Sequence, residues 1–581
     1  MRDYQTGCVA PKRKFPGGRC LVAVLAIMVS NATLDAAERP NVVLVITDDQ
    51  GYGDMSCHGN PIMKTPNLDL LHAQSVRLTN FHVDPTCSPT RSALMTGRYS
   101  CRTGVWHTIM GRSLLRRDEV TMADVFAASG YRTGIFGKWH LGDNYPYRPQ
   151  DRGFHEVLTI GGGGVGQTPD FWGNDYFDDS FRHNGRIETY SGYCTDVFFT
   201  NAMKFIEANK SRPFFAYIPT NAPHSPYNIA DSFSRPFRDQ GVSPQRANFY
   251  GMITNIDENV GKLTKKLAEL GLDQNTILIF MTDNGSAAGF DQKTGEGFNA
   301  GMRGMKGSAY DGGHRVPCFI RWPANLEGGR DVGRLTTHMD LMLTLIELCG
   351  MKRPESARLD GTSLVPLIQR PDSDWPDRTL VVQSHRIEHP LPWRQSAVMT
   401  DRWRLIDGKE LFDMENDPGQ KKDVAAARPD DVATLRAAYE LWYADVSTRF
   451  SEYCEIAIGT EAENPTRLCC HDWHGEIAPS SQDMVERKMK ANGFWSVQVD
   501  RDGMYEFTLR ERPMEANHPI KATTARLSAA GRELELPVPS GATSVSFSLP
   551  LKAGSTRVQT WLSDEEGVSH GAFYVEVKRL P

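Results

Sequence analysis

The chain has 581 residues, of which 40% are hydrophobic and 23% charged, and its formal net charge is −6. This length exceeds one ordinary domain, so we expect two to four structural units with ample hydrophobic core. The acidic balance, with a sequence pI near 6.3, argues against a nucleic-acid partner, which would require a basic surface.

The first 37 residues have the pattern of an export signal. Basic residues at positions 12–14 precede the apolar run Leu21–Val29, which is too short to span a bilayer. Ala36 and Ala37 then offer a small-residue cleavage site. We predict a signal peptide over 1–37, a periplasmic or secreted mature protein and no stable membrane insertion. An uncleaved anchor is the alternative.

Nine cysteines follow the predicted signal. Export would allow disulfides, and an odd number leaves at least one thiol unpaired. Cys87 is our candidate for that thiol. Spacing leaves the pairing of the others open, and Cys318 and Cys349 have the apolar surroundings of buried thiols.

Apolar strands alternate with helical segments over residues 38–370. Asn41–Thr47 and Asn275–Thr282 are nearly continuous apolar runs, as in buried parallel strands. The alternation predicts an α/β domain with a mainly parallel sheet flanked by helices. Further strands are predicted at Tyr131–Phe136, Phe214–Pro219 and Cys318–Arg321, and helices at Pro66–Ala73, Thr121–Ser129, Asp196–Ala208, Arg246–Leu270 and Asp340–Cys349.

Residues 371–465 predict a small α+β subdomain. Its helix is expected at Asp430–Phe450, and its short strands at Thr379–Gln383, Gln395–Met399, Trp403–Ile406 and Glu410–Asp413.

Residues 471–581 predict an accessory β-rich module, similar to a β-sandwich. Trp495–Val499 and Met504–Arg510 flank Asp502-Gly503, which is a hairpin signal. Trp495 and Trp561 suit either core packing or sugar binding, and the sequence leaves both open.

Polar residues follow four of the predicted strands of the α/β domain. Ligands of parallel α/β sheets gather at the carboxyl ends of strands, so these residues are expected to form one site. They are Asp48 and Asp49, Asp283 and Asn284, Lys138 and His140, and His224.

Two acidic clusters at separate strand ends favour a shared metal ion. Adjacent carboxylates repel each other unless a cation intervenes. Aspartate and asparagine offer oxygen ligands, which suit calcium or magnesium better than zinc. For Asp48-Asp49 alone, a turn or a helix cap is the alternative. Lys138, Lys306 and Arg91 offer positive charge for an anionic substrate, and the two histidines offer proton transfer.

The segment Cys87-Ser88-Pro89-Thr90-Arg91 puts a cysteine at the mouth of a short predicted helix. Pro89 suits the first helical position, Ser88 can cap it and Gly97 suits its exit. The positive field of the helix end, with Arg91, favours anions and activates sulfur. A plain buried cysteine beside a surface arginine is the alternative.

With these motifs in order, the chain resembles the type I sulfatases of the alkaline-phosphatase-like superfamily. The matches run from Pro40 to about Asp423, and C-x-P-x-R followed by T-G-R is highly specific. The module after residue 470 lies outside the resemblance. The matching segments are 48–55 (DDQGYGDM), 65–71 (TPNLDLL), 87–98 (CSPTRSALMTGR), 137–142 (GKWHLG), 222–224 (APH), 282–285 (TDNG), 312–317 (GGHRVP) and 411–413 (LFD) with Asp417-Pro418.

The resemblance implies that a formylglycine-generating enzyme oxidises Cys87 to Cα-formylglycine, whose hydrated diol is the nucleophile. It also implies one Ca²⁺, or Mg²⁺, held by Asp48, Asp49, Asp283, Asn284 and the converted residue 87. By the same resemblance, Arg91 supports the formylglycine, Lys138 and Lys306 hold sulfate oxygens, His224 protonates the leaving alcohol and His140 acts on the second hydroxyl.

The resemblance implies hydrolysis of sulfate esters with release of inorganic sulfate, and export together with the added module favours a sulfated carbohydrate as substrate. Trp106, His107, Arg98 and the loop at 161–190 are candidates for the substrate pocket, although each also suits a packing role. The alternatives are a phosphodiesterase or phosphonate ester hydrolase of the same superfamily, and an inactive sugar-binding homologue. The complete set of site residues argues against inactivity.

Overall fold

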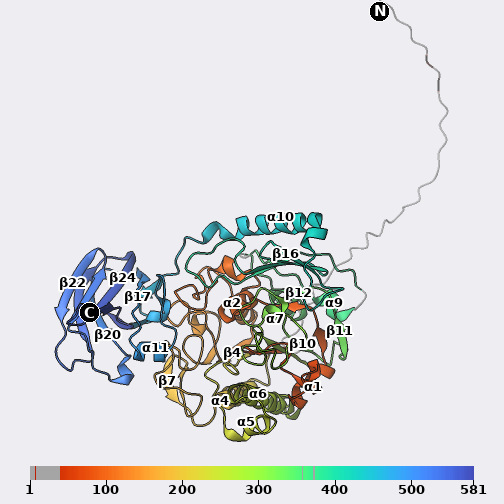
Figure 1. Cartoon of the computed structure of the whole chain (residues 1–581), viewed down its shortest axis with the longest axis horizontal. Coiled ribbons are helices and arrows are strands. Elements are labelled where there is room, and N and C mark those ends of the chain that lie inside the picture. The colour runs from red at the N-terminus through yellow and green to blue at the C-terminus, as the bar shows by residue number, and fades with distance from the viewer. Residues whose placement is uncertain (1–6, 8, 10–38, 356–357, 371–372) are drawn as a thin grey trace, which may run out of the picture.

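The computed structural model describes residues 39–355, 358–370 and 373–581, together with Gly7 and Val9. The predicted signal peptide lies outside the described residues, apart from these two. In Figure 1 the helices and the large sheet form one body, and the C-terminal β-strands form a second body beside it.

A ten-stranded mixed sheet forms the centre of the larger body, in the order β11-β2-β10-β9-β1-β8-β4-β5-β6-β7. Its middle strands β9 (Thr276–Thr282), β1 (Asn41–Thr47), β8 (Phe214–Pro219) and β4 (Arg132–Gly137) are parallel to their neighbours within this group. The first three are fully buried because helices cover both faces, which explains their unbroken apolar sequences. The predicted parallel sheet is confirmed.

The outer strands are short. β10 (Cys318–Arg321) pairs antiparallel with β9, so the sheet is mainly rather than wholly parallel. The remaining strands are β2 (Val76–Leu78), β5 (Glu156–Thr159), β6 (Ser180–His183), β7 (Arg186–Thr189) and β11 (Arg330–Val332), while β3 (Phe81–His82) pairs separately with β12 (Thr336–Thr337).

Helices pack on both faces of this sheet. Alternate side chains of β1 enter two different core clusters: Leu44 packs with side chains of α2, α3 and α8, and Val45 with side chains of α1, α4 and α6. The helices are α1 (Pro66–Ala73), α2 (Cys87–Thr96), α3 (Met122–Ala128), α4 (Cys194–Ala208), α5 (Asp231–Arg238), α6 (Pro244–Glu269), α7 (Asp311–His314), α8 (Asp340–Leu348) and α9 (Val365–Gln369).

A four-stranded antiparallel sheet follows along the chain, and α10 (Pro429–Val446) packs on it through Leu435 and Tyr439. Its strands are β13 (Leu380–Gln383), β14 (Ser396–Met399), β15 (Trp403–Ile406) and β16 (Glu410–Asp413).

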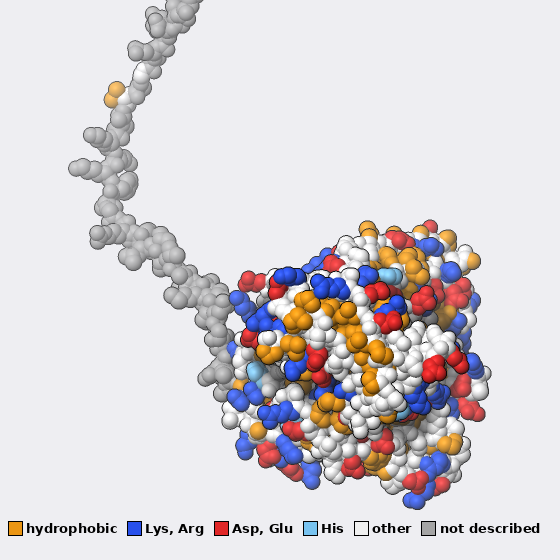
Figure 2. All heavy atoms as spheres, turned by 90° about the vertical axis from the view of Figure 1, so that its left-hand side faces the viewer, with side chains coloured by type: hydrophobic (Ala, Val, Ile, Leu, Met, Phe, Trp, Pro, Cys, Tyr) orange, Lys and Arg blue, Asp and Glu red, His pale blue; other side chains and the backbone are white. Residues whose placement is uncertain are grey.

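The C-terminal strands form two sheets around one hydrophobic core. β23 (Val545–Leu551) alternates strictly between buried and exposed residues, as expected of a strand with one face on the core. Figure 2 shows the side of the molecule on which this module lies, with hydrophobic, acidic and basic side chains intermixed. The other strands are β17 (Ile456–Ile458), β18 (Thr466–Cys469), β19 (Phe494–Val499), β20 (Gly503–Arg510), β21 (Thr524–Ala529), β22 (Arg532–Pro537), β24 (Gly554–Ser563), β25 (Ser569–His570) and β26 (Tyr574–Arg579).

The predicted hairpin around Asp502-Gly503 is wrong. β19 pairs with β17 and β24, whereas β20 pairs with β23 and β26 in the other sheet. The Asp502 carboxylate accepts a hydrogen bond from the Ala553 amide at 2.8 Å and pairs with Lys552, so the turn is tied to the β23–β24 connection. Two adjacent apolar strands bury more surface by facing each other across a sandwich than by pairing edge to edge.

Trp495 is fully buried, and its indole nitrogen donates to the Cys469 carbonyl at 2.7 Å, so it has a core role. Each of the nine described cysteines is a free thiol. The two helices of 18 or more residues, α6 and α10, are too polar to cross a membrane, and every other described helix is too short.

Candidate active site

The four central strands bring the predicted polar clusters to one edge of the sheet. Because β9, β1, β8 and β4 are adjacent and parallel, the residues that follow their last positions are neighbours in space. Lys306 comes from a loop whose Gly307 amide donates to the Pro85 carbonyl at 2.8 Å, two residues before Cys87.

The acidic residues form one compact cluster. Carboxylate oxygens of Asp48, Asp49 and Asp283 lie within 4.8 Å of one another, and all three side chains are buried. The Asp49 amide donates to Asp283 Oδ1, and Asn284 Nδ2 donates to Asp49 Oδ1, both at 3.0 Å. Asp49 has a φ of 67°, in the left-handed region that a side chain disfavours, as is common at functional sites.

Each carboxylate has its own cationic partner. Lys138 Nζ lies 2.6 Å from Asp48, and Lys306 Nζ lies 2.6 Å from Asp49. Arg91 pairs with Asp283 at 2.8 Å. Buried charges of one sign persist only when such partners offset them, so the lysines and the arginine hold the acidic cluster together.

The charges shift the carboxyl groups in different directions. Burial, with repulsion from Asp48, raises the pKa of Asp283 to about 7. Burial also acts to raise the pKa of Asp49, but Lys306 and His224 outweigh it and hold that pKa below its ordinary value. Asp48 Oδ1 and Asn284 Oδ1 are buried without a hydrogen-bond partner among the described residues. Such oxygens suit a hard divalent cation, so the residues present fit calcium or magnesium.

Cys87 is the first residue of α2, and its side chain is 2% exposed. The prediction that Ser88 caps this helix is wrong, because its hydroxyl donates to the His140 carbonyl at 3.0 Å and Thr86 occupies the cap position. The predicted activation of the sulfur is also wrong. Burial raises the pKa of the Cys87 thiol, although Lys138 and Lys306 lie close enough to oppose the shift.

Each of the two predicted histidines has one ring nitrogen without a hydrogen bond among the described residues, which is therefore available for proton transfer. His140, with a φ of 61°, directs Nε2 to the Thr108 carbonyl at 2.8 Å, which leaves Nδ1 as a buried lone pair without a partner among the described residues. His224 Nδ1 donates to the Ser225 carbonyl at 2.6 Å, and its Nε2 lies 3.7 Å from Asp49. Burial lowers the pKa of His140 well below its usual range and that of His224 to about 4.

The glycine run Gly161–Gly164 lies against both histidines. A Cβ at Gly163 would stand 2.2 Å from His140 Cε1, and one at Gly164 would stand 3.2 Å from His224 Nδ1. Gln167 Oε1 accepts from the Gly163 amide at 3.0 Å and holds the loop in place. Four consecutive glycines, Gly161–Gly164, were the available signal of a close backbone approach.

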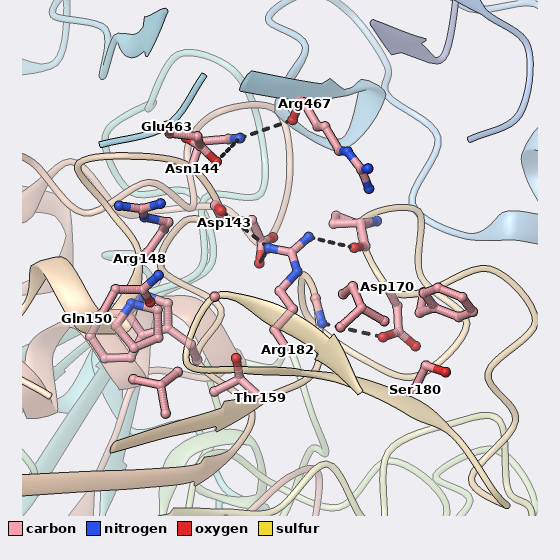
Figure 3. A pocket seen from close by; sticks show the side chains of 18 of the residues that line it. Asp143, Asn144, Arg148, Gln150, Thr159, Asp170, Ser180, Arg182, Glu463 and Arg467 are labelled. Carbon is pink, nitrogen blue, oxygen red and sulfur yellow. Dashed lines mark hydrogen bonds and ion pairs between the residues drawn. The ribbon is translucent and has the colours of Figure 1, made fainter. Parts of the chain in front are cut away.

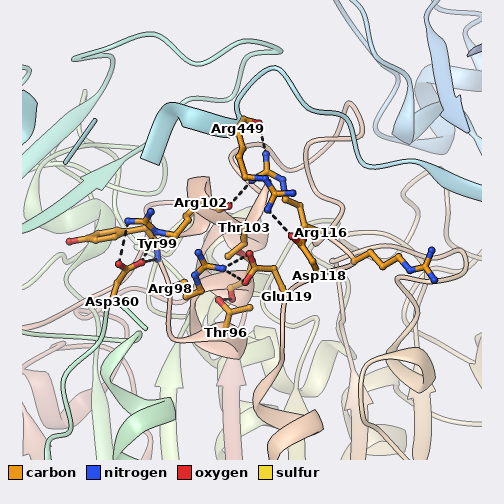
Figure 4. A network of polar contacts seen from close by, with 12 residues as sticks. Thr96, Arg98, Tyr99, Arg102, Thr103, Arg116, Asp118, Glu119, Asp360 and Arg449 are labelled. Atoms are coloured by element: carbon orange, nitrogen blue, oxygen red, sulfur yellow. Dashed lines mark hydrogen bonds and ion pairs between the residues drawn. The ribbon is translucent and has the colours of Figure 1, made fainter. Parts of the chain in front are cut away.

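The candidates for a substrate pocket have mixed outcomes. Arg98 pairs with Glu119 at 2.6 Å within the polar network of Figure 4, which gives it a structural role. Trp106 is buried, with its indole nitrogen on the Ile387 carbonyl and the Arg112 guanidinium over its ring. His107 lines a groove of about 640 Å³ that opens to the surface.

A second cavity, of about 390 Å³, lies between the large sheet and the C-terminal module (Figure 3). Arg182 crosses it to pair with Asp143 at 3.0 Å, and Asn144 donates to the Arg467 carbonyl at 3.1 Å. The acidic cluster, Cys87 and the predicted histidines are absent from its lining, so this cavity is distinct from the candidate active site.

Comparison with known proteins agrees with this geometry. The model of the family described as "Sulfatase" matches residues 40–351, and a model described as "N-sulphoglucosamine sulphohydrolase, C-terminal" matches residues 305–438. Human arylsulfatase A is 34% identical over 371 residues, covering 58% of this chain and 69% of the relative. The rat N-acetylgalactosamine-6-sulfatase is 30% identical over 382 residues, covering 61% of this chain and 68% of the relative.

Solved structures show the same fold. A crystal structure described as Ps i-CgsB in complex with k-i-k-neocarrahexaose is 28% identical, with a TM-score of 0.64, and covers 72% of this chain and 95% of that chain. The putative sulfatase yidJ from Bacteroides fragilis is 22% identical, with a TM-score of 0.58. With its mainly parallel α/β sheet and strand-end cluster, this chain belongs to the sulfatase family and is a sulfuric ester hydrolase.

Proposed function

We propose that the protein is an exported carbohydrate sulfatase that uses one divalent cation and a formylglycine at position 87. The observation that carries this proposal is the cluster of Asp48, Asp49, Asp283 and Asn284, which lies beside Cys87, buried Lys138 and half-buried Lys306 and has two acceptor oxygens without a partner among the described residues. A sulfate ester is anionic, and a cation with lysines on either side is a suitable environment for its oxygens.

Asp48, Asp49, Asp283 and Asn284 would hold the cation, together with the converted residue 87. Calcium is our first choice and magnesium the alternative, because the donors are all oxygens. When bound, the cation withdraws charge from sulfate oxygens, and the formylglycine provides the nucleophile in place of a thiol. A buried Cys87 thiol with a raised pKa is a poor nucleophile, which fits a role as the precursor of formylglycine and not as the nucleophile itself.

The protein's own side chains would bind the sulfate group and transfer protons. Lys138 and Lys306 neutralise the acidic cluster and bind sulfate oxygens, while Arg91 fixes Asp283 and supports residue 87. His224 would protonate the leaving alcohol through Nε2, since a bound anion raises the pKa of a neighbouring imidazole. His140, whose Nδ1 carries a free lone pair, would accept a proton from the second hydroxyl.

Relatives support a sulfated carbohydrate as substrate. N-acetylgalactosamine-6-sulfatases are among them, and a structural neighbour at 28% identity was solved in complex with k-i-k-neocarrahexaose. A matching panel contains N-acetylgalactosamine 6-sulfate, a sulfated carrageenan oligosaccharide, p-nitrophenyl sulfate and bis(p-nitrophenyl) phosphate. We expect sulfate release from at least one saccharide and preference for the sulfate over the phosphodiester. A preference for the phosphodiester would contradict the proposal.

Mass spectrometry of the peptide that contains Cys87 tests the modification directly. Protein made with a formylglycine-generating enzyme should lose about 18 Da at this peptide relative to unmodified cysteine. Cys87→Ala should abolish turnover while the unfolding temperature changes little. The matched control is Cys318→Ala, in another buried thiol far along the chain. An active Cys87→Ala variant would refute the assignment.

A further inference from the structure

His471 is a residue of the C-terminal module that lies at the candidate active site. It is in the 3₁₀ turn η6 (Cys470–Asp472), beyond residue 438, where the family matches end. Its ring centre is 5.9 Å from that of His140, with 52° between the ring planes. The module thus reaches a side chain that we expect to act on the reacting atoms.

The backbone of His471 is fixed from both sides. Its carbonyl accepts a hydrogen bond from the Met110 amide at 2.7 Å, and the preceding Cys470 amide donates to the Phe573 carbonyl at 2.8 Å. Met110, Leu114 and Tyr147 of the α/β region belong to the same hydrophobic cluster as the core of the module. The imidazole is therefore held in place by packing, as a binding group has to be.

The imidazole has an unused hydrogen-bonding atom. His471 is 2% exposed, and its Nε2 has no hydrogen-bond partner among the described residues. Its Nδ1 faces the Asp472 carboxylate at 3.5 Å, which favours hydrogen on Nδ1 and leaves Nε2 as an acceptor. Buried polar atoms are rarely left without a partner, so the free Nε2 beside His140 points to a hydrogen bond with a ligand.

A groove opens at the surface close to the residues that hold His471. It has a volume of about 640 Å³, and its lining includes His107, Met110, Arg386, Glu388 and Phe494. Met110 is the residue that bonds the His471 carbonyl. Arg386 is exposed, and no ion pair is found for its guanidinium within the described parts of the chain. The groove therefore shares Met110 with the contact that holds His471, and it carries the Arg386 guanidinium in its lining.

We propose that the C-terminal module completes the substrate site, with His471 Nε2 accepting a hydrogen bond from a hydroxyl of the sugar ring that carries the sulfate. The next ring of an oligosaccharide occupies the groove, where Arg386 binds an anionic substituent. This inference rests on the proposed carbohydrate sulfatase activity and assigns to the module a part in substrate choice. His471 would contact substrate without taking part in bond breaking.

The test compares saccharide and aryl sulfates in the full-length modified enzyme. His471→Ala should lower kcat/KM by about 10- to 100-fold on the best saccharide of the panel, mainly through KM, because a binding hydrogen bond is lost. On p-nitrophenyl sulfate, which has no sugar hydroxyl, kcat/KM should change less than about threefold. His471→Gln, which keeps an acceptor near the Nε2 position, should recover part of the loss.

Two further variants separate binding from folding. His570→Ala removes another buried histidine of the module, whose ring hydrogen-bonds the Gly571 carbonyl and no other group in the described parts of the chain, and should leave the ratio of saccharide to aryl activity unchanged. Arg386→Ala, at an exposed position, should raise KM for the carrageenan oligosaccharide about three- to tenfold and leave the monosaccharide unaffected.

If His471→Ala lowers kcat/KM equally on the saccharide and on p-nitrophenyl sulfate, or lowers it on neither, this inference is overturned and the proposed function is left intact. A wild-type enzyme that cleaves p-nitrophenyl sulfate but no saccharide would instead contradict the carbohydrate assignment, and this inference with it.

Discussion

The α/β region and the C-terminal module both carry their candidate site residues just after the end of a strand, but the strands of the two regions have different sequence patterns. In the α/β region, β1 and β9 are apolar in all but their first and last residues, and charge begins directly after each strand, as with Asp48 and Asp283. In the module, polar and apolar residues alternate along strands such as β23, and His471 lies in the turn after β18. Strand ends, rather than strand faces, carry the candidate site.

The largest expected effect concerns the strand-end cluster. Asp283→Asn removes one carboxylate and leaves Arg91 without its ionised partner, so we expect sulfate release to fall by about 10³-fold or more. Wild-type enzyme should gain about 2.7 kcal/mol of unfolding free energy in Ca²⁺ at 100 times its Kd, and the variant should lose most of this gain. Calcium-dependent thermal unfolding measures the second effect.

Asp311→Asn is the matched control for that prediction. Asp311 is also fully buried and pairs with Arg404 at 3.1 Å, outside the cluster. The Asp311→Asn variant should have a lower free energy of unfolding than the wild type, and Ca²⁺ should still stabilise it. If both variants respond to calcium as the wild type does, the strand-end cluster does not hold the cation.

A smaller effect is expected for proton transfer at the end of β8. His224→Ala should slow saccharide sulfates by about 100-fold, because a sugar alkoxide needs a proton to leave. The loss on p-nitrophenyl sulfate should stay below about tenfold, since nitrophenolate leaves unprotonated. His183→Ala, at a histidine bound to Glu156 and Glu188, serves as the control. Equal losses on both esters would remove His224 from this role.

The smallest expected effect concerns the contacts between the module and the segment 167–173, which follows the glycine run Gly161–Gly164. Gln482 Nε2 donates to the carbonyls of Gln167 and Phe171, both at 3.2 Å, and its Oε1 accepts from the Gly173 amide at 3.0 Å. Gln482→Ala should lower the unfolding free energy by about 1–2 kcal/mol and saccharide kcat/KM about threefold. Urea unfolding and initial rates measure both quantities.

Gln498→Ala provides the comparison for Gln482→Ala, because among the described residues its side-chain amide bonds only the Val499 carbonyl and the Ser555 hydroxyl, both within the module. It should leave saccharide turnover unchanged. Similar kinetic losses in the two variants would mean that the module affects turnover through its own stability rather than through the loop.

Local patterns in the sequence predicted that the polar residues at the strand ends lie close together, and the structure places the three aspartates in one cluster. The apolar runs of β1, β8 and β9 end within one residue of their predicted positions. Asp48 and Asp283 therefore directly follow their strands, as predicted. Parallel pairing of these strands then brings the residues together without further information. The same reasoning failed at α2, where Pro89 indicated a helix start that lies two residues earlier, at Cys87.

The contribution of the module could not be predicted in this way. His471 has no motif around it, and its place beside His140 depends on a backbone contact with Met110, 361 residues earlier in the chain. The hairpin signal at Asp502-Gly503 failed for a related reason, because sheet membership in a sandwich depends on long-range burial rather than on the turn.

The burial of Cys87 has a consequence for the order of events in biogenesis. Cys87 is 2% exposed, and Lys138, Lys306, Asp48 and Asp283 lie close to it, so the thiol is out of reach of another enzyme once this region has folded. An enzyme that carries out the proposed conversion therefore has to act before folding, which leaves one early opportunity for each newly made chain.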